Sequence, residues 1–185
     1  LQASHTLMQN LPFFFIIGRP RSGTTLLRLL FEAHPNLLIP PESPFIIILY
    51  KKYGKITDWS EPIIKEFCED LYKQRYFEKW LIERDELLNR LLKHRGQNTF
   101  QGMVTQVYLA YKSVYEKKDL VMIGDKNPMY SLYASRIHKL YPDSKIIHIT
   151  RDYRDNYLSL VNVNFEVPVV PIVVYRRKYA LKKMW

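Results

Sequence analysis

The chain has 185 residues, of which 47% are hydrophobic, so it can form one domain with a buried core. It carries 28 Lys and Arg against 18 Asp and Glu, a formal net charge of +10. This excess indicates an anionic partner. Because the basic residues are spread widely and not gathered into a stripe, we expect a small phosphorylated molecule and no nucleic acid. The longest apolar runs are too short to span a membrane, so membrane association is not indicated.

Cys68 is the single cysteine, which excludes an intrachain disulfide. This cysteine usage is compatible with a reducing compartment, and we expect a cytoplasmic protein. Cys68 has no cysteine partner, and no pair of histidines has ligand spacing on one helix face. We therefore expect no metal site.

Strand-like and helix-like segments alternate along the chain after a lead-in over residues 1–11. The apolar run at 12–17 predicts a first strand that ends at Gly18. Further strands are expected at 37–39, 120–123 and 145–149. Helices are expected at 24–33, within 61–95, at 103–117, at about 130–140 and from about 154. The alternation predicts an α/β fold in three layers, with a parallel sheet of about four to five strands and helices on both faces. Ligands bind such sheets beyond the carboxyl ends of the strands, where each motif below falls.

Residues 18–25, Gly-Arg-Pro-Arg-Ser-Gly-Thr-Thr, follow the first strand and open the first helix. The spacing of Gly18 and Gly23 and the hydroxyl of Thr25 match a P-loop, in which backbone N–H groups point at an anion. Thr24 stands where that pattern has lysine, which argues against nucleoside triphosphate chemistry. Arg21 can supply the positive charge instead, through a fork suited to phosphate or sulfate oxygens.

The run Pro20-Arg21-Ser22-Gly23-Thr24-Thr25 resembles the 5′-phosphosulfate loop of sulfotransferases. Its continuation, LLRLLFEAHPN, is similar to the tyrosylprotein and bacterial branch of that family. The resemblance implies that 3′-phosphoadenosine 5′-phosphosulfate is the cofactor and that this loop binds it through Arg21, Ser22, Gly23, Thr24 and Thr25.

A second anion motif ends the strand at 145–149. An arginine at a strand end and a serine on the next helix can share one phosphate, although a surface network of Arg and Asp is an alternative. The run Arg151-Asp152-Tyr153-Arg154-Asp155, followed by Ser159, resembles the 3′-phosphate motif of sulfotransferases, with Tyr153 where the family often has Pro. The resemblance covers roughly residues 12–165. It implies that Arg151 and Ser159 hold the 3′-phosphate.

Two further strand ends carry candidates for the chemistry. Glu42 follows Pro40-Pro41, and the resemblance implies that it is the general base for the acceptor. Lys126 follows the third strand, and the resemblance places a lysine here near the transferred group, which Arg21 would also stabilise. The alternative for Glu42 is a loop carboxylate that only pairs with a nearby arginine. The alternative for Lys126 is a solvated loop lysine. Other sulfotransferases use a histidine base, but His34 is expected to cap a helix and His148 to lie in the core.

The resemblance therefore implies a sulfotransferase that moves a sulfuryl group to an acceptor by in-line transfer. A small-molecule P-loop kinase and a non-catalytic nucleotide-binding module remain the alternatives. A hydroxyl acceptor is the default, and it can belong to a small molecule, a glycan or a peptide. The aromatic-rich segment 44–115 is expected to set specificity, and the oligomeric state is not predicted.

The end of the chain predicts a helix from about residue 173, with no Gly, Asn or Pro to close it. Sulfotransferases carry a further segment after the 3′-phosphate motif, and nothing here matches it. We expect residues 1–185 to form a single sulfotransferase-like domain that is incomplete at its C-terminus.

Overall fold

The computed structural model describes residues 11–161. Residues 1–10 of the expected lead-in and the expected helix from about 173 lie outside this range. The chain divides into two compact units, Leu1–Arg151 and Asp152–Trp185, and each is described by itself.

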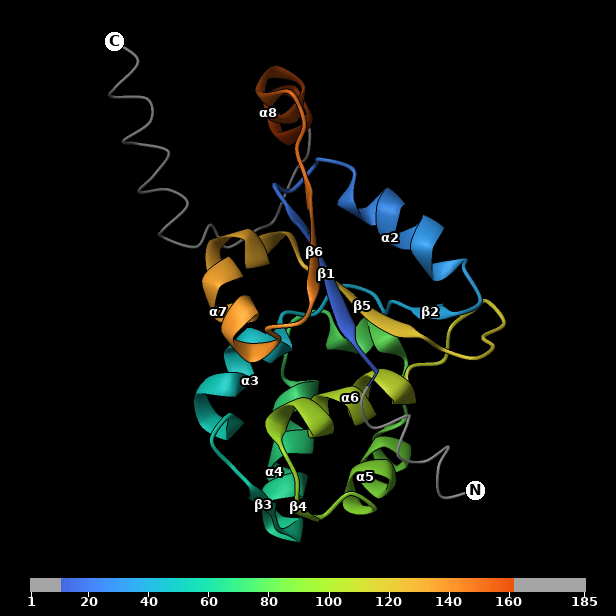
Figure 1. Cartoon of the computed structure of the whole chain (residues 1–185), viewed down its shortest axis with the longest axis vertical. Coiled ribbons are helices and arrows are strands. Elements are labelled where there is room, and N and C mark those ends of the chain that lie inside the picture. Colours follow the sequence, from blue (N-terminus) through green and yellow to red (C-terminus); the bar gives the residue numbers. More distant parts are fainter. Residues whose placement is uncertain (1–10, 162–185) are drawn as a thin grey trace. The chain divides into compact units, whose positions relative to one another are not determined.

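Four parallel strands form the central sheet of the first unit (Figure 1). They are β1 (Phe13–Gly18), β2 (Leu37–Leu38), β5 (Met122–Lys126) and β6 (Lys145–Ile149), in the order β2-β5-β1-β6. All six residues of β1 are buried, as expected for a central parallel strand covered on both faces. The parallel α/β sheet predicted from the sequence is confirmed.

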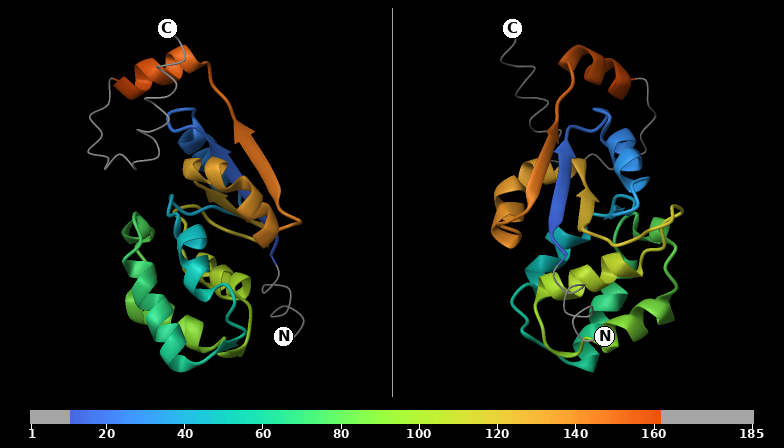
Figure 2. Two further views of the ribbon diagram at one scale, coloured as in Figure 1. Left: turned by 90° about the vertical axis from the view of Figure 1, so that its left-hand side faces the viewer. Right: turned by 45° about the vertical axis from the view of Figure 1, so that its right-hand side comes forward.

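Helices cover both faces of this sheet (Figures 1 and 2). Helix α2 (Thr24–Glu32) lies on one face, where Leu27 and Phe31 pack against Phe14 and Ile16. The other face contributes Phe13 and Phe15 to a larger aromatic core. Only part of the expected apolar face of α2 is packed, because three of its leucines are exposed: Leu26, Leu29 and Leu30.

The larger core lies among helices contributed by the middle of the chain. These are α3 (Phe45–Tyr53), α4 (Glu61–Tyr72), the short 3₁₀ helix η1 (Phe77–Trp80), α5 (Arg84–Leu92) and α6 (Phe100–Ala110). The 3₁₀ helix η2 (Pro128–Tyr133) and α7 (Ala134–Leu140) connect β5 to β6. Helix α3 and a small antiparallel pair, β3 (Asp58–Trp59) with β4 (Gly96–Gln97), were not predicted.

Helix α6 differs from its predicted range of 103–117. It begins at Phe100, where the Thr99 hydroxyl caps it by accepting the N–H of Gly102 over 3.0 Å, and it ends at Ala110. Beyond Ala110 the chain leaves the core, so burial of an apolar face no longer favours a helix. Lys117 instead turns back and donates to the carbonyl oxygen of Glu32.

Strand β5 is displaced toward the C-terminus from its predicted range of 120–123. Its last residues, Asp125 and Lys126, pair with Phe15 and Ile16 of β1, and the N–H of Asn127 donates to Ile16 over 3.2 Å. Polar side chains thus belong to the strand, because buried Asp125 and Lys126 find polar partners in Asn127 and Glu42.

The second unit contains helix α8 (Tyr153–Val161) among the described residues, close to its predicted start at Arg154. Within residues 11–161, no helix combines the length and the hydropathy that a membrane span requires.

Candidate functional site

The expected motifs of the first unit follow strand ends at one edge of the sheet. Gly18, which ends β1, pairs with Ile149, which ends β6. On the other side of β1, Ile16 pairs with Lys126 at the end of β5. Because the strands are parallel, their carboxyl ends share this edge, so the loop at 18–25 lies beside Lys126 and the start of the 3′-phosphate motif.

The loop at 18–25 has the backbone of an anion-binding turn. Gly18 and Gly23 have φ angles of 155° and 90°, and a Cβ on Gly18 would lie 2.6 Å from the carbonyl oxygen of Ile149. Arg21 adopts φ 68°, in the left-handed region that only glycine enters readily. Gly23 precedes α2 and has no side chain to cap the first N–H groups of the helix, so these groups suit an anion.

Arg151 connects the two anion motifs. Its Nη1 donates to the carbonyl oxygen of Arg21 over 3.1 Å, across 130 residues of sequence. The contact is to the backbone of Arg21, so it places the cationic Arg151 side chain against the loop at 18–25 and adds positive charge there. Ser159 lies on α8 in the second unit, and its expected role at the 3′-phosphate stays a prediction.

The structure brings together the two candidates for the chemistry. Lys126 Nζ lies 2.6 Å from Glu42 Oε2, although the residues are 84 positions apart in sequence. The Lys126 side chain is 5% exposed and that of Glu42 is 28% exposed. A nearly buried ammonium needs such a partner, and the carboxylate is the member of the pair that an incoming molecule can reach.

The segment before Glu42 is held by helix α2. Ile39 donates its N–H to the Glu32 carboxylate, and its carbonyl oxygen accepts from Arg28 Nη1 over 2.9 Å. Glu32 is buried and pairs with Lys117 over 3.6 Å. These contacts were not predicted from the sequence. The one sequence signal was the charge of Arg28 and Glu32 within a helix that is otherwise largely apolar. Such charged residues are equally typical of the solvent-facing side of a helix.

Asp125 precedes Lys126 in strand β5. Its Oδ1 accepts from Asn127 Nδ2 over 2.5 Å, and the side chain is 3% exposed. Burial raises the pKa of Asp125 to about 7, while Tyr108, Asn127 and Tyr130 partly oppose the rise. Carboxyl groups with a shifted pKa are typical of functional sites.

Within residues 11–161, the histidines do not form a cluster at this edge. His148 was expected in the core, but it is exposed, because β6 is an outer strand of the sheet and most of its residues face solvent. His34 follows α2, and its Nδ1 accepts the N–H of Asn36 over 3.2 Å. Among the described residues, no group of three or more His, Cys, Asp or Glu has a geometry suited to a metal ion.

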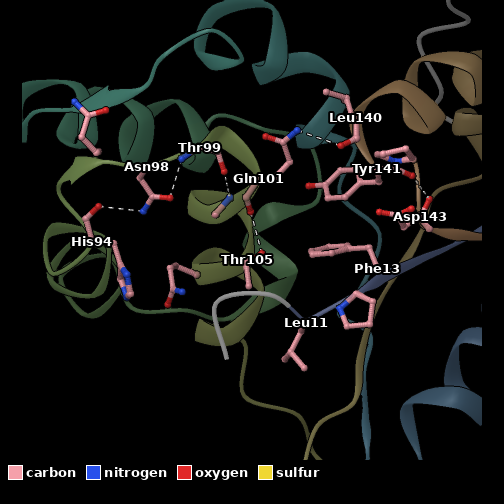
Figure 3. A pocket seen from close by; sticks show the side chains of 16 residues that line it. Leu11, Phe13, His94, Asn98, Thr99, Gln101, Thr105, Leu140, Tyr141 and Asp143 are labelled. Atoms are coloured by element: carbon pink, nitrogen blue, oxygen red, sulfur yellow. Dashed lines mark hydrogen bonds between the residues drawn. The ribbon is translucent and has the colours of Figure 1, made fainter. Parts of the chain in front are cut away.

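A separate hollow of about 600 Å³ lies near the amino ends of β1 and β6 (Figure 3). Its polar side chains bond within the protein: Gln101 donates to Leu140, Thr105 to Gln101 and Asn98 to His94. Its lining contains no Lys or Arg. This hollow therefore offers no Lys or Arg to hold an anion, and it does not include any residue predicted for the site.

The chain belongs to the sulfotransferase family, whose sequence model matches residues 12–170. It is 28% identical to nodulation protein NoeE of Sinorhizobium fredii over 138 residues, which cover 75% of this chain and 28% of that protein. It is 25% identical to protein-tyrosine sulfotransferase 1 of Rattus norvegicus over 174 residues, which cover 92% of this chain and 40% of that protein.

A putative protein-tyrosine sulfotransferase of Caenorhabditis briggsae is 27% identical over 150 residues, which cover 80% of this chain and 42% of that protein. The chain thus spans less than half the length of these relatives. The family membership agrees with the α/β fold and with the resemblance found from the two motifs.

Proposed function

We propose that this chain takes a sulfuryl group from 3′-phosphoadenosine 5′-phosphosulfate and transfers it to an acceptor hydroxyl. The observation that carries the proposal is the contact of Glu42 with Lys126 at 2.6 Å, at the sheet edge that also presents the loop at 18–25. This edge combines a carboxylate, an ammonium and an anion-binding turn.

The donor would be held by residues of both motifs. Two observations support binding of the 5′-phosphosulfate end of the donor by the loop at 18–25. Arg21 and Gly23 have left-handed backbone conformations, and the start of α2 has no side-chain cap. The binding residues would be Arg21, Ser22, Gly23, Thr24 and Thr25. Arg151 and Ser159 would hold the 3′-phosphate, the arginine through its charged fork and the serine through its hydroxyl.

The chemistry divides between Glu42 and the cations. When bound, the donor supplies a sulfuryl group activated by its bond to a phosphate. Glu42 accepts the proton of the acceptor hydroxyl as the acceptor oxygen bonds to sulfur and the electron pair of the broken bond leaves on the phosphate. Lys126 and Arg21 stabilise the negative charge that grows on the transferred and leaving oxygens.

Specificity for the acceptor would come from segment 44–115. Most of its aromatic side chains are committed to the core, including Tyr53, Trp59, Phe67, Phe77, Trp80 and Tyr108. Tyr50, Tyr72 and Tyr111 are only partly buried, so they are better candidates for lining an acceptor site. The relatives named as protein-tyrosine sulfotransferases favour a peptide acceptor, with a glycan or small molecule as alternatives.

Cys68 is a free, buried thiol, which is consistent with the cytoplasmic location that we also propose.

Isothermal titration with 3′,5′-adenosine bisphosphate and, separately, with ATP tests the proposal. We expect binding of the bisphosphate to exceed binding of ATP, because Thr24 replaces the lysine that a triphosphate loop requires. Tight binding of ATP without a response to the bisphosphate would instead identify a kinase-like site. Binding of neither nucleotide would contradict the proposal as well.

A further inference from the structure

The backbone on both sides of Glu42 is held by side chains from distant parts of the chain. Trp80 Nε1 donates to the carbonyl oxygen of Pro41 over 2.8 Å. Asn127 Nδ2 donates to the carbonyl oxygen of Ser43 over 3.3 Å. These two carbonyl groups belong to the residues immediately before and after Glu42, so both donors restrict where the Glu42 backbone lies.

The Trp80 ring is itself immobilised by other aromatic rings. Its residue is 2% exposed, and its ring centroid lies 5.0 Å from that of Tyr108, 5.2 Å from Phe77 and 5.7 Å from Phe45. Well-packed rings of this kind have defined rotamers. The indole N–H is therefore a fixed donor, and the Pro41 carbonyl must come to it.

The 3₁₀ helix η1, which ends at Trp80, is bounded by two strained residues. Tyr76 and Leu81 have φ angles of 66° and 51°, although neither is glycine. Leu81 is also 87% exposed, so burial of its own side chain does not explain its conformation. Backbone strain persists where the surrounding structure imposes it, and here it flanks the residue that contacts the Glu42 loop.

We propose that Trp80 is a positioning residue for Glu42. Its N–H holds the Pro41 carbonyl, and the Pro40-Pro41 pair transmits this constraint because proline restricts the backbone. The carboxylate of Glu42 then stays at Lys126 instead of sampling the solvent. This inference rests on the proposed role of Glu42 as the base, and Trp80 acts only through the loop.

The test is Trp80→Phe, with Trp59→Phe as its matched control. Both tryptophans are buried in the same core cluster, but Trp59 Nε1 has no hydrogen-bond partner in the described part of the chain. Each change removes similar ring volume, and only Trp80→Phe removes a bond to the Glu42 loop. We expect kcat to fall about three- to tenfold in Trp80→Phe, with little change in KM or in bisphosphate affinity.

The same variants are compared by hydrogen exchange at the Glu42 and Ser43 amides, which requires no turnover. We expect faster exchange in Trp80→Phe and wild-type exchange in Trp59→Phe. If Trp80→Phe does not fold, 3-benzothienylalanine at position 80 replaces the N–H by sulfur and keeps the ring shape. Wild-type exchange and wild-type kcat in either position-80 variant would overturn the inference.

These outcomes separate the inference from the proposed function. If the wild-type chain binds bisphosphate and turns over but both position-80 variants match it, Trp80 has no positioning role and the proposed function stands. If the wild-type chain neither binds nor turns over, the proposed function fails. Hydrogen exchange then still decides whether Trp80 holds the loop.

Discussion

Lys126 Nζ and Glu42 Oε2 lie 2.6 Å apart, and this ion pair joins the segment that follows strand β2 to the last residue of strand β5. Neither residue is close to the other in sequence. A carboxylate that is paired with a lysine yet 28% exposed has the access to solvent that a general base for an incoming hydroxyl requires.

Replacement of Glu42 by Gln separates donor binding from turnover. The amide keeps the size of the side chain but does not take up a proton, so we expect sulfuryl transfer to fall by about 10²–10⁴-fold. Bisphosphate affinity stays near wild type, because the base acts on the acceptor. The matched control is Glu66→Gln, which disrupts an exposed pair with Lys52. Wild-type turnover in Glu42→Gln would redirect the search to a histidine base.

Replacement of Arg21 or Arg151 by Ala weakens bisphosphate binding. Each change removes a charged donor from phosphate oxygens, and a hydrogen bond to a charged group contributes about 1.5–3 kcal/mol. We therefore expect a loss of about tenfold or more for each variant by calorimetric titration. Arg84→Ala serves as the control, because Arg84 forms an exposed pair with Glu69. Equal losses in all three variants would indicate a nonspecific charge effect.

Asp125 makes stability depend on pH. Burial raises its pKa to about 7 in the folded chain, whereas an unfolded aspartate titrates near 3.9. Between about pH 4 and 7 the folded state holds a proton that the unfolded state has lost. The contribution of this group to the free energy of unfolding is therefore full below pH 4 and falls as pH rises to 7.

Replacement of Asp125 by Asn should remove that dependence. Between pH 4 and pH 8, the free energy of unfolding of the wild-type chain should fall relative to that of the variant by on the order of 4 kcal/mol at most. Denaturant unfolding of both proteins at several pH values measures the difference. Parallel pH profiles for the two proteins would show that Asp125 has an ordinary pKa.

Replacement of Glu32 by Ala should destabilise the fold at strand β2. The change leaves the Ile39 N–H without its acceptor and removes the carboxylate that pairs with Lys117, which keeps only backbone carbonyl oxygens as partners. Because Lys117 keeps 13% exposure of its side chain, we expect a loss of about 3 kcal/mol in the free energy of unfolding.

The control for Glu32 is Glu116→Ala, which breaks an exposed pair with Lys118 at 3.3 Å. Exposed pairs contribute about 0–1 kcal/mol, so this variant should unfold close to wild type. Similar losses in the two variants would mean that burial adds nothing to the Glu32 contact.

The sequence by itself determined the class of fold and the two anion motifs. Strand β1 was predictable because a run of apolar and aromatic residues that stops at glycine is typical of a buried parallel strand. The loop at 18–25 was predictable because its chemistry is local: glycines and a helix start, all within eight residues of sequence. The resemblance to sulfotransferases followed from motifs of the same local kind, and the family match agrees with it.

Only the tertiary structure decided which residues support that chemistry. Glu32 and Arg28 hold Ile39 and Trp80 holds Pro41, through contacts with backbone groups 7, 11 and 39 positions away, and no local pattern marks such contacts. Contacts with the rest of the chain likewise determine the shortened range of α6 and the displaced range of β5. Propensity describes a segment alone, whereas burial and polar pairing against the rest of the chain determine where each element ends and which side chains meet.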